Sequence, residues 1–206
     1  MKKLITLITL SFILYPLSFS FASVDANLVQ KAEEYLNSIT GLSGNFTQLA
    51  NGNTERGEFS MLRPGRVRLD YKTLPVQLIS NGRDLFFYDR SLDQITTVPL
   101  TSTPAGILVR NNINLRTSDI EVSHTSETAT EFRVRMHIKN QSGVGNIELV
   151  FGKKPTALKS WIVNDATGTR TEVSFENMQV KTNFPRNFFE LQRMRTTGAS
   201  GDSFYD

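Results

Sequence analysis

The sequence predicts a mainly β protein with helices (α+β), in which about eleven antiparallel strands form one long sheet. Apolar and polar residues alternate through most of residues 44–180, which is the period of a half-buried strand. Tight-turn dipeptides such as Asn51-Gly52 and Asn81-Gly82 separate the alternating segments. Only one long segment has helical periodicity, and the short links leave no room for crossover helices, so neighbouring strands must be antiparallel.

The first residues are typical of an export signal. Lys2 and Lys3 precede an apolar run from Leu4 to Phe21, and Ser20-Phe21-Ala22 places small residues at the positions that signal peptidases require. Pro16 and this small-residue end argue against a retained membrane anchor. We therefore expect residues 1–22 to be a cleaved signal peptide, which leaves a soluble, exported mature chain.

Charge and cysteine content exclude three classes of protein. The chain has 23 Lys and Arg against 20 Asp and Glu, so removal of Lys2 and Lys3 leaves 21 against 20. A nearly neutral chain with interspersed signs lacks an electrostatic footprint for nucleic acid. The absence of cysteine excludes a disulfide framework and a lipid-anchored protein, so the core must form by apolar burial alone.

One amphipathic helix is expected at the front of the mature domain. Asp25 is placed to cap its start, and Gly41 is placed to end it. Its apolar stripe recurs at spacings of three and four residues and consists of Leu28, Val29, Ala32, Tyr35, Leu36 and Ile39.

Eleven strands follow, each a short alternating run bounded by turn residues. They are expected at Gly44 to Ala50, Glu55 to Leu62, Arg66 to Tyr71, Val76 to Ser80, Asp84 to Asp89, Leu92 to Val98, Ser118 to His124, Glu131 to Lys139, Gly145 to Phe151, Leu158 to Asn164 and Thr169 to Val180.

The hairpin around Arg63-Pro64-Gly65 is the centre of the chain's organisation. Pro64 and Gly65 favour a tight reversal, and Arg63 stands at its corner. On the second arm, Val67, Leu69 and Tyr71 share one face. In the strand from Glu131 to Lys139, the even residues Phe132, Val134, Met136 and Ile138 form the apolar face.

A sheet of this length must curl, and it then either closes into a barrel or leaves a gap that another segment covers. The one interruption of the strand pattern lies between Pro99 and Thr117. Thr103-Pro104 is a helix-start signal, and Ile107, Leu108 and Val109 follow as a short apolar patch. Gly106 weakens this helix, so the segment is either a marginal lid or a fixed loop.

The domain is expected to span residues 23–191. Its last part, Phe184 to Leu191, carries enough aromatic surface to dock as a short edge strand. Residues 192–206 are polar, contain Gly and Ser, and are expected to be a disordered tail.

No catalytic constellation is recognisable in the sequence. The two histidines, His124 and His137, form no metal-ligand cluster at a recognisable spacing, so no metal is expected. No nucleophile elbow, phosphate loop or dinucleotide fingerprint occurs, so no cofactor or enzymatic activity is expected. A pair of carboxylates from distant parts of the chain stays open, because acids far apart in sequence can meet in space. The aromatic residues, including Phe87 and Trp161, alternate as core residues do. Because two helices cover little of such a sheet, the barrel either collapses tightly or holds an apolar cavity.

An ordered series of short motifs resembles the outer-membrane lipoprotein carrier family, LolA. These are Phe46-Thr47-Gln48, Gly57-Glu58-Phe59, Arg63-Pro64-Gly65-Arg66-Val67-Arg68, Ile79-Ser80-Asn81-Gly82, Leu85-Phe86-Phe87-Tyr88-Asp89, Gln94-Ile95-Thr96, Pro99-Leu100, Thr103-Pro104, and Trp161 followed by Asp165. The resemblance covers nearly all of the mature domain.

The resemblance implies an unclosed antiparallel β-barrel of eleven strands with an α-helical lid over an apolar interior. It implies a monomeric periplasmic chaperone that accepts outer-membrane lipoproteins from an inner-membrane ABC release complex. The cargo would pass to the outer membrane through an acceptor lipoprotein, where one exists. Arg63 would bond the lid backbone, and the lid would run from Pro104 to Arg110 and include Ile107 and Leu108.

The acyl chains of the cargo would then lie against the apolar face of the sheet. The residues expected there are Phe59, Val67, Leu69, Tyr71, Phe87, Phe132, Val134, Met136 and Trp161. Two other functions stay open: a regulator that senses lipid or lipoprotein through a similar domain, and a periplasmic hydrolase.

Overall fold

The computed structural model describes residues 24–140, 143 and 145–191. The expected signal peptide and tail lie outside these residues. The described part contains no helix that is long and apolar enough to cross a membrane.

The front of the described chain is a single α-helix, α1 (Ala26–Ser38). The Asp25 side chain caps it by accepting a hydrogen bond from the Asn27 N–H, because the first N–H groups of a helix lack partners within it. The helix ends earlier than expected: Ile39 is its C-cap, and Gly41 already begins the first strand. Leu28, Val29, Ala32 and Leu36 are buried, as the apolar stripe predicts.

Eleven strands form one antiparallel sheet, as the alternation predicted. They are β1 (Gly41–Ala50), β2 (Asn53–Leu62), β3 (Arg66–Tyr71), β4 (Val76–Asn81), β5 (Asp84–Asp89), β6 (Gln94–Pro99), β7 (Ile120–Glu127), β8 (Glu131–Ile138), β9 (Asn146–Lys153), β10 (Thr156–Asn164) and β11 (Arg170–Val180).

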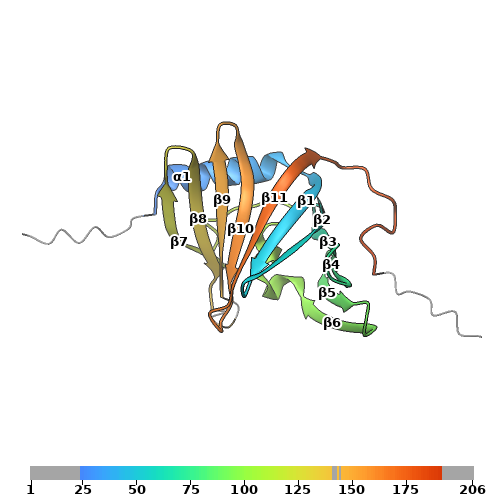
Figure 1. Ribbon diagram of the computed structural model, residues 1–206. Coiled ribbons are helices and arrows are strands. Elements are labelled where there is room, and N and C mark those ends of the chain that lie inside the picture. Colours follow the sequence, from blue (N-terminus) through green and yellow to red (C-terminus); the bar gives the residue numbers. More distant parts are fainter. Residues whose placement is uncertain (1–23, 141–142, 144, 192–206) are drawn as a thin grey trace, which may run out of the picture.

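The order in the sheet is β6-β5-β4-β3-β2-β1-β11-β10-β9-β8-β7. β1 lies in the middle and pairs with β11, so β6 and β7 are the two outer edges. The sheet bends strongly, with β2–β6 turned across β7–β11 (Figure 1), but the two edges do not pair. The fold is therefore an unclosed barrel with one concave and one convex face.

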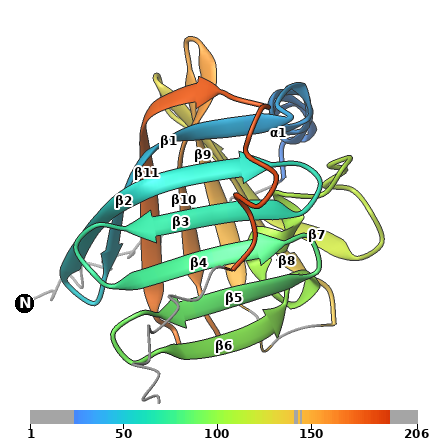
Figure 2. The same cartoon turned by 90° about the vertical axis from the view of Figure 1, so that its right-hand side faces the viewer.

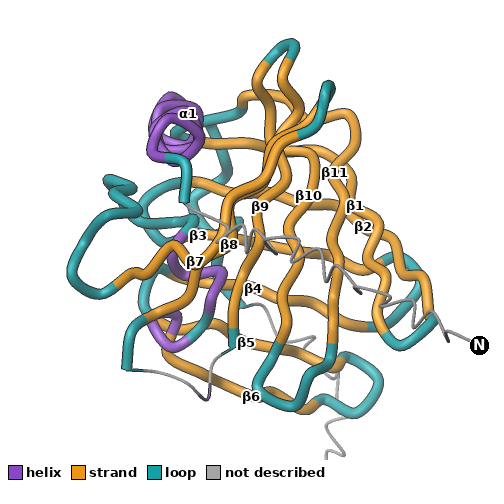
Figure 3. Tube along the Cα trace, turned by 90° about the vertical axis from the view of Figure 1, so that its left-hand side faces the viewer, coloured by secondary structure: helices purple, strands orange, loops and turns teal. Residues whose placement is uncertain are grey.

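The chain passes from one edge of the sheet to the other through residues 100–119, which we call the crossing segment. It leaves the end of β6, contains the 3₁₀ helices η1 (Leu100–Ser102) and η2 (Pro104–Ile107), and then reaches β7. In Figure 3 these helices lie within the curve of the sheet, with α1 at one end of the same concave side. The crossing segment and α1 together cover the concave face.

The C-terminal segment, residues 181–191, crosses the convex face of β2–β4 (Figure 2). It contains no strand, so the expectation of a short edge strand at Phe184 to Leu191 is wrong. Its aromatic residues dock instead: Phe189 is buried, and the Arg68 guanidinium donates to the Phe188 carbonyl at 2.7 Å and lies 4.7 Å from the Phe188 ring centroid. The segment runs across the face of the sheet and not along its edge, so it is held by side-chain contacts and does not pair as a strand.

Candidate functional site

The β2–β3 turn, residues 63–65, points at the crossing segment. The Arg63–Pro64 peptide bond is cis, and Gly65 has φ +74°, a backbone conformation that glycine adopts without cost. A Cβ on Gly65 would lie 2.5 Å from the Gly82 Cα atom, so this turn packs tightly against the β4–β5 turn. The tight packing fixes the backbone of the turn and therefore the position of the Arg63 Cα atom, from which the side chain extends.

Arg63 is buried and donates hydrogen bonds to three carbonyl groups. Its Nε lies 3.0 Å from the Leu108 oxygen in the crossing segment. Its Nη1 donates to the oxygens of Ile39, at 2.9 Å, and Leu36, at the end of α1. Burial lowers the pKa of Arg63 to about 10, so the guanidinium is still charged at neutral pH. One cation therefore joins the turn, the helix end and the crossing segment.

A second hydrogen bond joins the turn to the same place. The Gly65 N–H donates to the Val109 carbonyl at 2.7 Å. The adjacent residues Ile107, Leu108 and Val109 are all buried. We call residues 103–110 the lid, because this part of the crossing segment inserts its apolar side chains into the concave face.

The helical part of the lid is shorter than expected. A helix was expected from Pro104 to Arg110, whereas η2 spans Pro104–Ile107 in 3₁₀ geometry, and residues 108 and 109 form a turn. The Gly106 N–H donates to the Thr103 carbonyl and hydroxyl. A Cβ on Gly106 would lie 2.3 Å from the Leu100 oxygen, so the chain folds back closely on η1 here.

The interior beneath the lid is apolar and rich in aromatic side chains. Phe59 packs against Trp161 and Phe175, with ring centroids 5.8 and 4.9 Å apart. Phe132 stacks on Phe151 at 4.8 Å. The structure brings into this one cluster most of the residues expected to contact acyl chains, together with the two apolar lid residues: Phe59, Val67, Leu69, Tyr71, Ile107, Leu108, Phe132, Val134, Met136 and Trp161.

Tyr71 is the polar member of this set. Its hydroxyl donates to Gln48 Oε1 at 2.7 Å, and its ring lies 5.0 Å from that of Phe46. Burial raises the pKa of Tyr71 to about 12. The hydroxyl is therefore neutral and has a partner, as a buried polar group requires.

Phe87 differs from the other residues expected in the interior. It lies opposite Leu78, which lies opposite Leu69, so Phe87 is on the concave face. Its side chain is nevertheless 44 % exposed, because the covering elements do not reach the outer strands. Phe87 therefore lies on the expected face but outside the buried cluster, and the concave face has an uncovered apolar margin.

The interior is almost full in this conformation. The cavity between the lid, α1 and the aromatic cluster has a volume of about 20 Å³ and is lined by residues that include Leu36, Phe59, Arg63, Leu108 and Trp161. That volume holds about one water molecule. Of the two outcomes that the sequence left open, a tight interior or an apolar cavity, this closed arrangement is the tight one, because lid side chains occupy the space.

A second attachment of the crossing segment was not foreseen. On α1, Asn37 exchanges two hydrogen bonds with the Ile113 backbone, at 2.8 and 2.9 Å. Glu33 accepts from the Leu115 N–H at 2.6 Å and pairs with Arg116 at 2.5 Å. The sequence held a signal for this contact, because Glu33 interrupts the apolar stripe of the helix between Val29 and Leu36.

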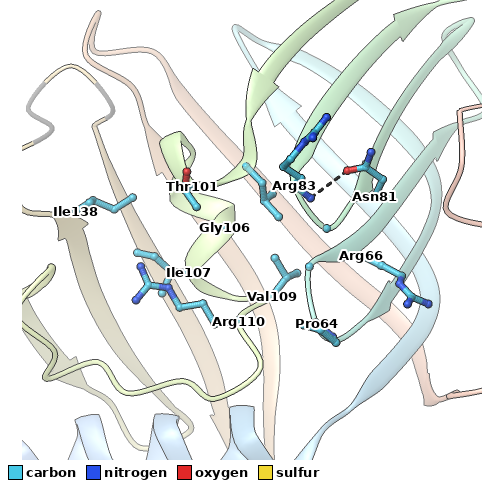
Figure 4. A pocket seen from close by; sticks show the side chains of 13 residues that line it. Pro64, Arg66, Asn81, Arg83, Thr101, Gly106, Ile107, Val109, Arg110 and Ile138 are labelled. Atoms are coloured by element: carbon cyan, nitrogen blue, oxygen red, sulfur yellow. Dashed lines mark hydrogen bonds between the residues drawn. The ribbon is translucent and has the colours of Figure 1, made fainter.

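A wider pocket of about 450 Å³ lies beside the lid (Figure 4). It is lined by Pro64 and Gly65 of the turn, by the lid residues Ile107 and Val109, and by Ile138 at the end of β8. In Figure 4 the Arg66 side chain extends away from the lid. This pocket is therefore a surface hollow next to Gly65 and Val109, which hold the lid.

No group of three or more potential metal ligands occurs among the residues that the structure describes. The site consists instead of an apolar interior, the short lid that covers it, and a small number of hydrogen bonds that hold the lid to the β2–β3 turn.

Known proteins resemble the chain over most of its length. An outer-membrane lipoprotein carrier protein of Neisseria meningitidis serogroup C is 27% identical over 184 residues, covering 85% of this chain and 87% of that protein. A protein with the same description from Methylococcus capsulatus is 28% identical over 188 residues, covering 85% and 88%. A solved LolA superfamily structure from Nitrosomonas europaea is 14% identical with a TM-score of 0.46, covering 79% of this chain and 96% of that one.

The family model described as outer membrane lipoprotein carrier protein LolA matches residues 37–192. The matched region extends from the end of α1 through every strand and the whole crossing segment. The chain therefore belongs to the LolA family.

Proposed function

We propose that this protein is a periplasmic carrier that shields the acyl chains of lipoproteins and carries them from the inner to the outer membrane. The observation that carries the proposal is the pairing of an apolar concave interior with a lid that Arg63 and Gly65 hold through two main-chain carbonyls. Family membership and the relatives described as lipoprotein carriers support it.

The energetics of acyl chains explain why such a carrier needs a cover. Each methylene group removed from water contributes about 0.8 kcal/mol, so a lipoprotein does not cross an aqueous compartment unprotected. In the closed form, Ile107, Leu108 and Val109 fill the interior. Acyl chains would displace these lid side chains and occupy the apolar surface that they cover now.

The lid is held weakly enough for the cargo to open it. A hydrogen bond contributes about 0.5–1.5 kcal/mol net, or up to about 3 kcal/mol when one partner is charged. The bonds from Arg63 to Leu108 and from Gly65 to Val109 therefore oppose opening by only a few kcal/mol. Burial of acyl chains offsets this cost, and release requires only a somewhat better acceptor.

In this proposal, residues 1–22 are a signal that is removed on export. The carrier accepts cargo from an inner-membrane ABC release complex and passes it to an outer-membrane acceptor lipoprotein where one exists. The protein acts by binding and not by catalysis.

The direct test uses the mature chain and spheroplasts that synthesise a labelled lipoprotein. We expect the lipoprotein to appear in the soluble fraction in a complex with the carrier. A lipoprotein whose acylation site is changed to serine is the matched control and should not depend on the carrier for release. Retention of the acylated lipoprotein on the spheroplasts would contradict the proposal.

The Arg63→Leu variant tests the role of the lid in the same assay. We expect impaired transfer, because loss of the Arg63 hydrogen bonds weakens the closed state. Lid closure then no longer competes with the binding of acyl chains, so the carrier releases its cargo less readily. Unchanged release and delivery by this variant would count against a role for Arg63.

A further inference from the structure

The sheet has two edges, and the structure protects only one of them. An exposed edge strand offers unpaired N–H and C=O groups to any other extended chain, and proteins usually blunt such edges with charges or bulges. β7 has both: its register shifts between Val122 and His124, and Glu121 and Glu127 carry charge. The chain before α1 also contacts it, because the Asp25 N–H donates to the Thr125 hydroxyl at 2.7 Å.

β6 lacks both charges and a bulge, and Pro99, at its last position, is its one residue of a type that blunts an edge. Its sequence, Gln94-Ile95-Thr96-Thr97-Val98-Pro99, has no charged side chain, and its pairing with β5 has no register shift. All of its residues are exposed except Ile95, which is half-buried. Figure 2 shows β6 as the outermost strand of its half of the sheet.

The register identifies the backbone groups of β6 that have no partner among the residues that the structure describes. The Leu100 N–H donates to the Arg83 carbonyl at 2.9 Å, so residues 98, 96 and 94 also direct their backbone groups toward β5. Ile95, Thr97 and Pro99 therefore direct theirs outward. Pro99 occupies a position where its missing N–H removes no bond to β5, which is where an edge strand tolerates proline.

The same edge continues the apolar concave face. Val98 lies opposite Leu85, which lies opposite Ser80, and Ser80 lies opposite the buried Val67. Val98 and Phe87 are 38 % and 44 % exposed. An extended chain added at β6 would therefore lie beside uncovered apolar side chains, and β6 leads directly into the crossing segment.

We propose that the β6 edge binds the extended polypeptide segment next to the acyl chains of the cargo, as a twelfth strand of the sheet. This inference rests on the proposed carrier function. It adds that the β6 edge, a surface separate from the apolar interior, recognises the polypeptide part of the cargo. The outward N–H groups of Ile95 and Thr97 donate to that segment, and their carbonyls accept from it. Main-chain bonds require no particular side chains, so one edge serves polypeptides of different sequence.

The test compares two synthetic triacylated lipopeptides with the same sequence. One has a free backbone, and the other carries N-methyl groups on alternate residues, which prevent strand pairing on one side. We expect the wild-type chain to bind the N-methylated lipopeptide roughly tenfold more weakly, because about two main-chain hydrogen bonds are lost. On binding of the free-backbone lipopeptide, amide exchange of Ile95 and Thr97 should slow.

The Thr97→Pro variant removes one outward N–H and puts the proline ring on the outward side of the edge, where it obstructs an incoming strand, without removing a bond to β5. We expect it to bind the two lipopeptides with nearly equal affinity. Glu127→Pro is the matched control, because the Thr128 N–H donates to the Glu131 carbonyl and Glu127 therefore directs its own N–H outward from the other edge. That variant should still discriminate between the lipopeptides, and thermal unfolding would verify that both variants fold.

Three results would overturn the inference, and they differ in meaning. If wild-type protein binds both lipopeptides equally, the β6 edge does not pair with cargo, although the carrier function stands. If wild-type protein binds neither, the carrier function itself fails. If the free protein is a dimer in sedimentation and Thr97→Pro makes it a monomer, the occupant of the edge is a second copy of the chain.

Discussion

At the scale of single residues, Arg63 combines burial with three main-chain acceptors from two separate segments. The carbonyls of Leu36 and Ile39 belong to the end of α1, where helix carbonyls lack partners within the helix. A buried cation there satisfies them and complements the negative end of the helix dipole. The same side chain reaches Leu108, so helix end and lid depend on one group.

Replacement of Arg63 by leucine should destabilise the protein by about 3 kcal/mol, because the carbonyls of Leu36, Ile39 and Leu108 each lose a hydrogen bond from a charged donor. Urea unfolding measures the change. Arg66→Leu, at the exposed first residue of β3 directly after the turn, is the control and should stay within about 0.5 kcal/mol of wild type. Equal effects of the two substitutions would show that the contacts of Arg63 contribute nothing specific.

Gly65→Ala should also destabilise the fold, by about 3 kcal/mol, because it combines a positive φ with a steric clash. The added Cβ would lie 2.5 Å from the Gly82 Cα atom. Gly168→Ala separates the two causes, since Gly168 has φ +85° but no atom within 4 Å of its Cβ position, and it should cost only about 1 kcal/mol. Thermal unfolding of both variants tests the difference, and similar melting temperatures would exclude the clash.

At the scale of elements, the lid is the part that the proposed cycle must move. The chain contains no cysteine, so a Leu108→Cys variant has a single thiol, at a position that is 3 % exposed. We expect slow reaction with a maleimide in the free protein, because the thiol reacts only when the lid opens. Adding Arg63→Leu should accelerate labelling at least about tenfold, since one charged hydrogen bond contributes about 1.5–3 kcal/mol.

Thr101→Cys provides the control for this labelling experiment. Thr101 is exposed beside the lid, so its thiol should react quickly whether or not Arg63 is present. Rapid labelling of Leu108→Cys in the otherwise unchanged protein would contradict a closed lid in solution.

The C-terminal segment is the other element attached mainly by side chains. Phe189→Ala should destabilise the protein by about 3 kcal/mol, because a buried ring leaves a cavity. Phe87→Ala makes the same chemical change at a side chain that is 44 % exposed and should cost less than about 1 kcal/mol. Urea unfolding would compare them, and an equal loss would mean that the segment does not dock as described.

The sequence predicted the regular elements well, because their signals are local. Each strand lies within a few residues of its alternating run, and the Asp25 cap is present. The lid geometry was harder to predict, because Gly106 packs on the Leu100 backbone and this contact selects a 3₁₀ turn instead of an α-helix. The docking of residues 181–191 depends on Arg68, which is more than a hundred positions away in the chain, so no local pattern shows it.

The residues of the candidate site also fall into those that a local sequence pattern predicts and those that it does not. Residues of the concave face were found by period two, which places Phe59, Leu69 and Phe132 on the buried side of their strands. Exposure of Phe87 depends on how far the covering elements extend, and a strand pattern contains no such information. Glu33 breaks the apolar stripe of α1, which marks the helix side of this contact, but its partners and those of Asn37 are mostly backbone groups of the crossing segment, and these carry no side-chain signature.

At the scale of the whole molecule, the sheet is stabilised on its convex side by charged networks. Asp70 accepts hydrogen bonds from Arg68, Gln77 and Arg90. Glu148, on β9, pairs with Arg133 and Arg135 of β8. These networks connect neighbouring strands in both halves of the curved sheet, while the apolar cluster lies on the concave side.

Both carboxylates should make stability depend on acid pH. Burial raises the pKa of each, but hydrogen bonds from Arg68 and Gln77, with the Arg90 charge, lower the pKa of Asp70 overall, and Arg135 and Arg133 do the same for Glu148. Because each pKa is lower in the folded chain, the unfolded chain binds more protons once the pH falls to about 4, the usual carboxyl pKa. The stabilisation is therefore present above this pH and is lost as the pH falls through the folded-state values.

Urea midpoints measured between pH 7 and pH 3 test this expectation. An Asp70→Asn, Glu148→Gln double variant should be less stable at pH 7 and should lose less stability on acidification, because the two groups that bind extra protons on unfolding are absent. Glu176→Gln, at an exposed carboxylate without an ion-pair partner among the described residues, should follow the wild-type curve. If the double variant loses as much stability as wild type, the acid sensitivity of the fold arises from other groups, and the two networks contribute to stability independently of their charge.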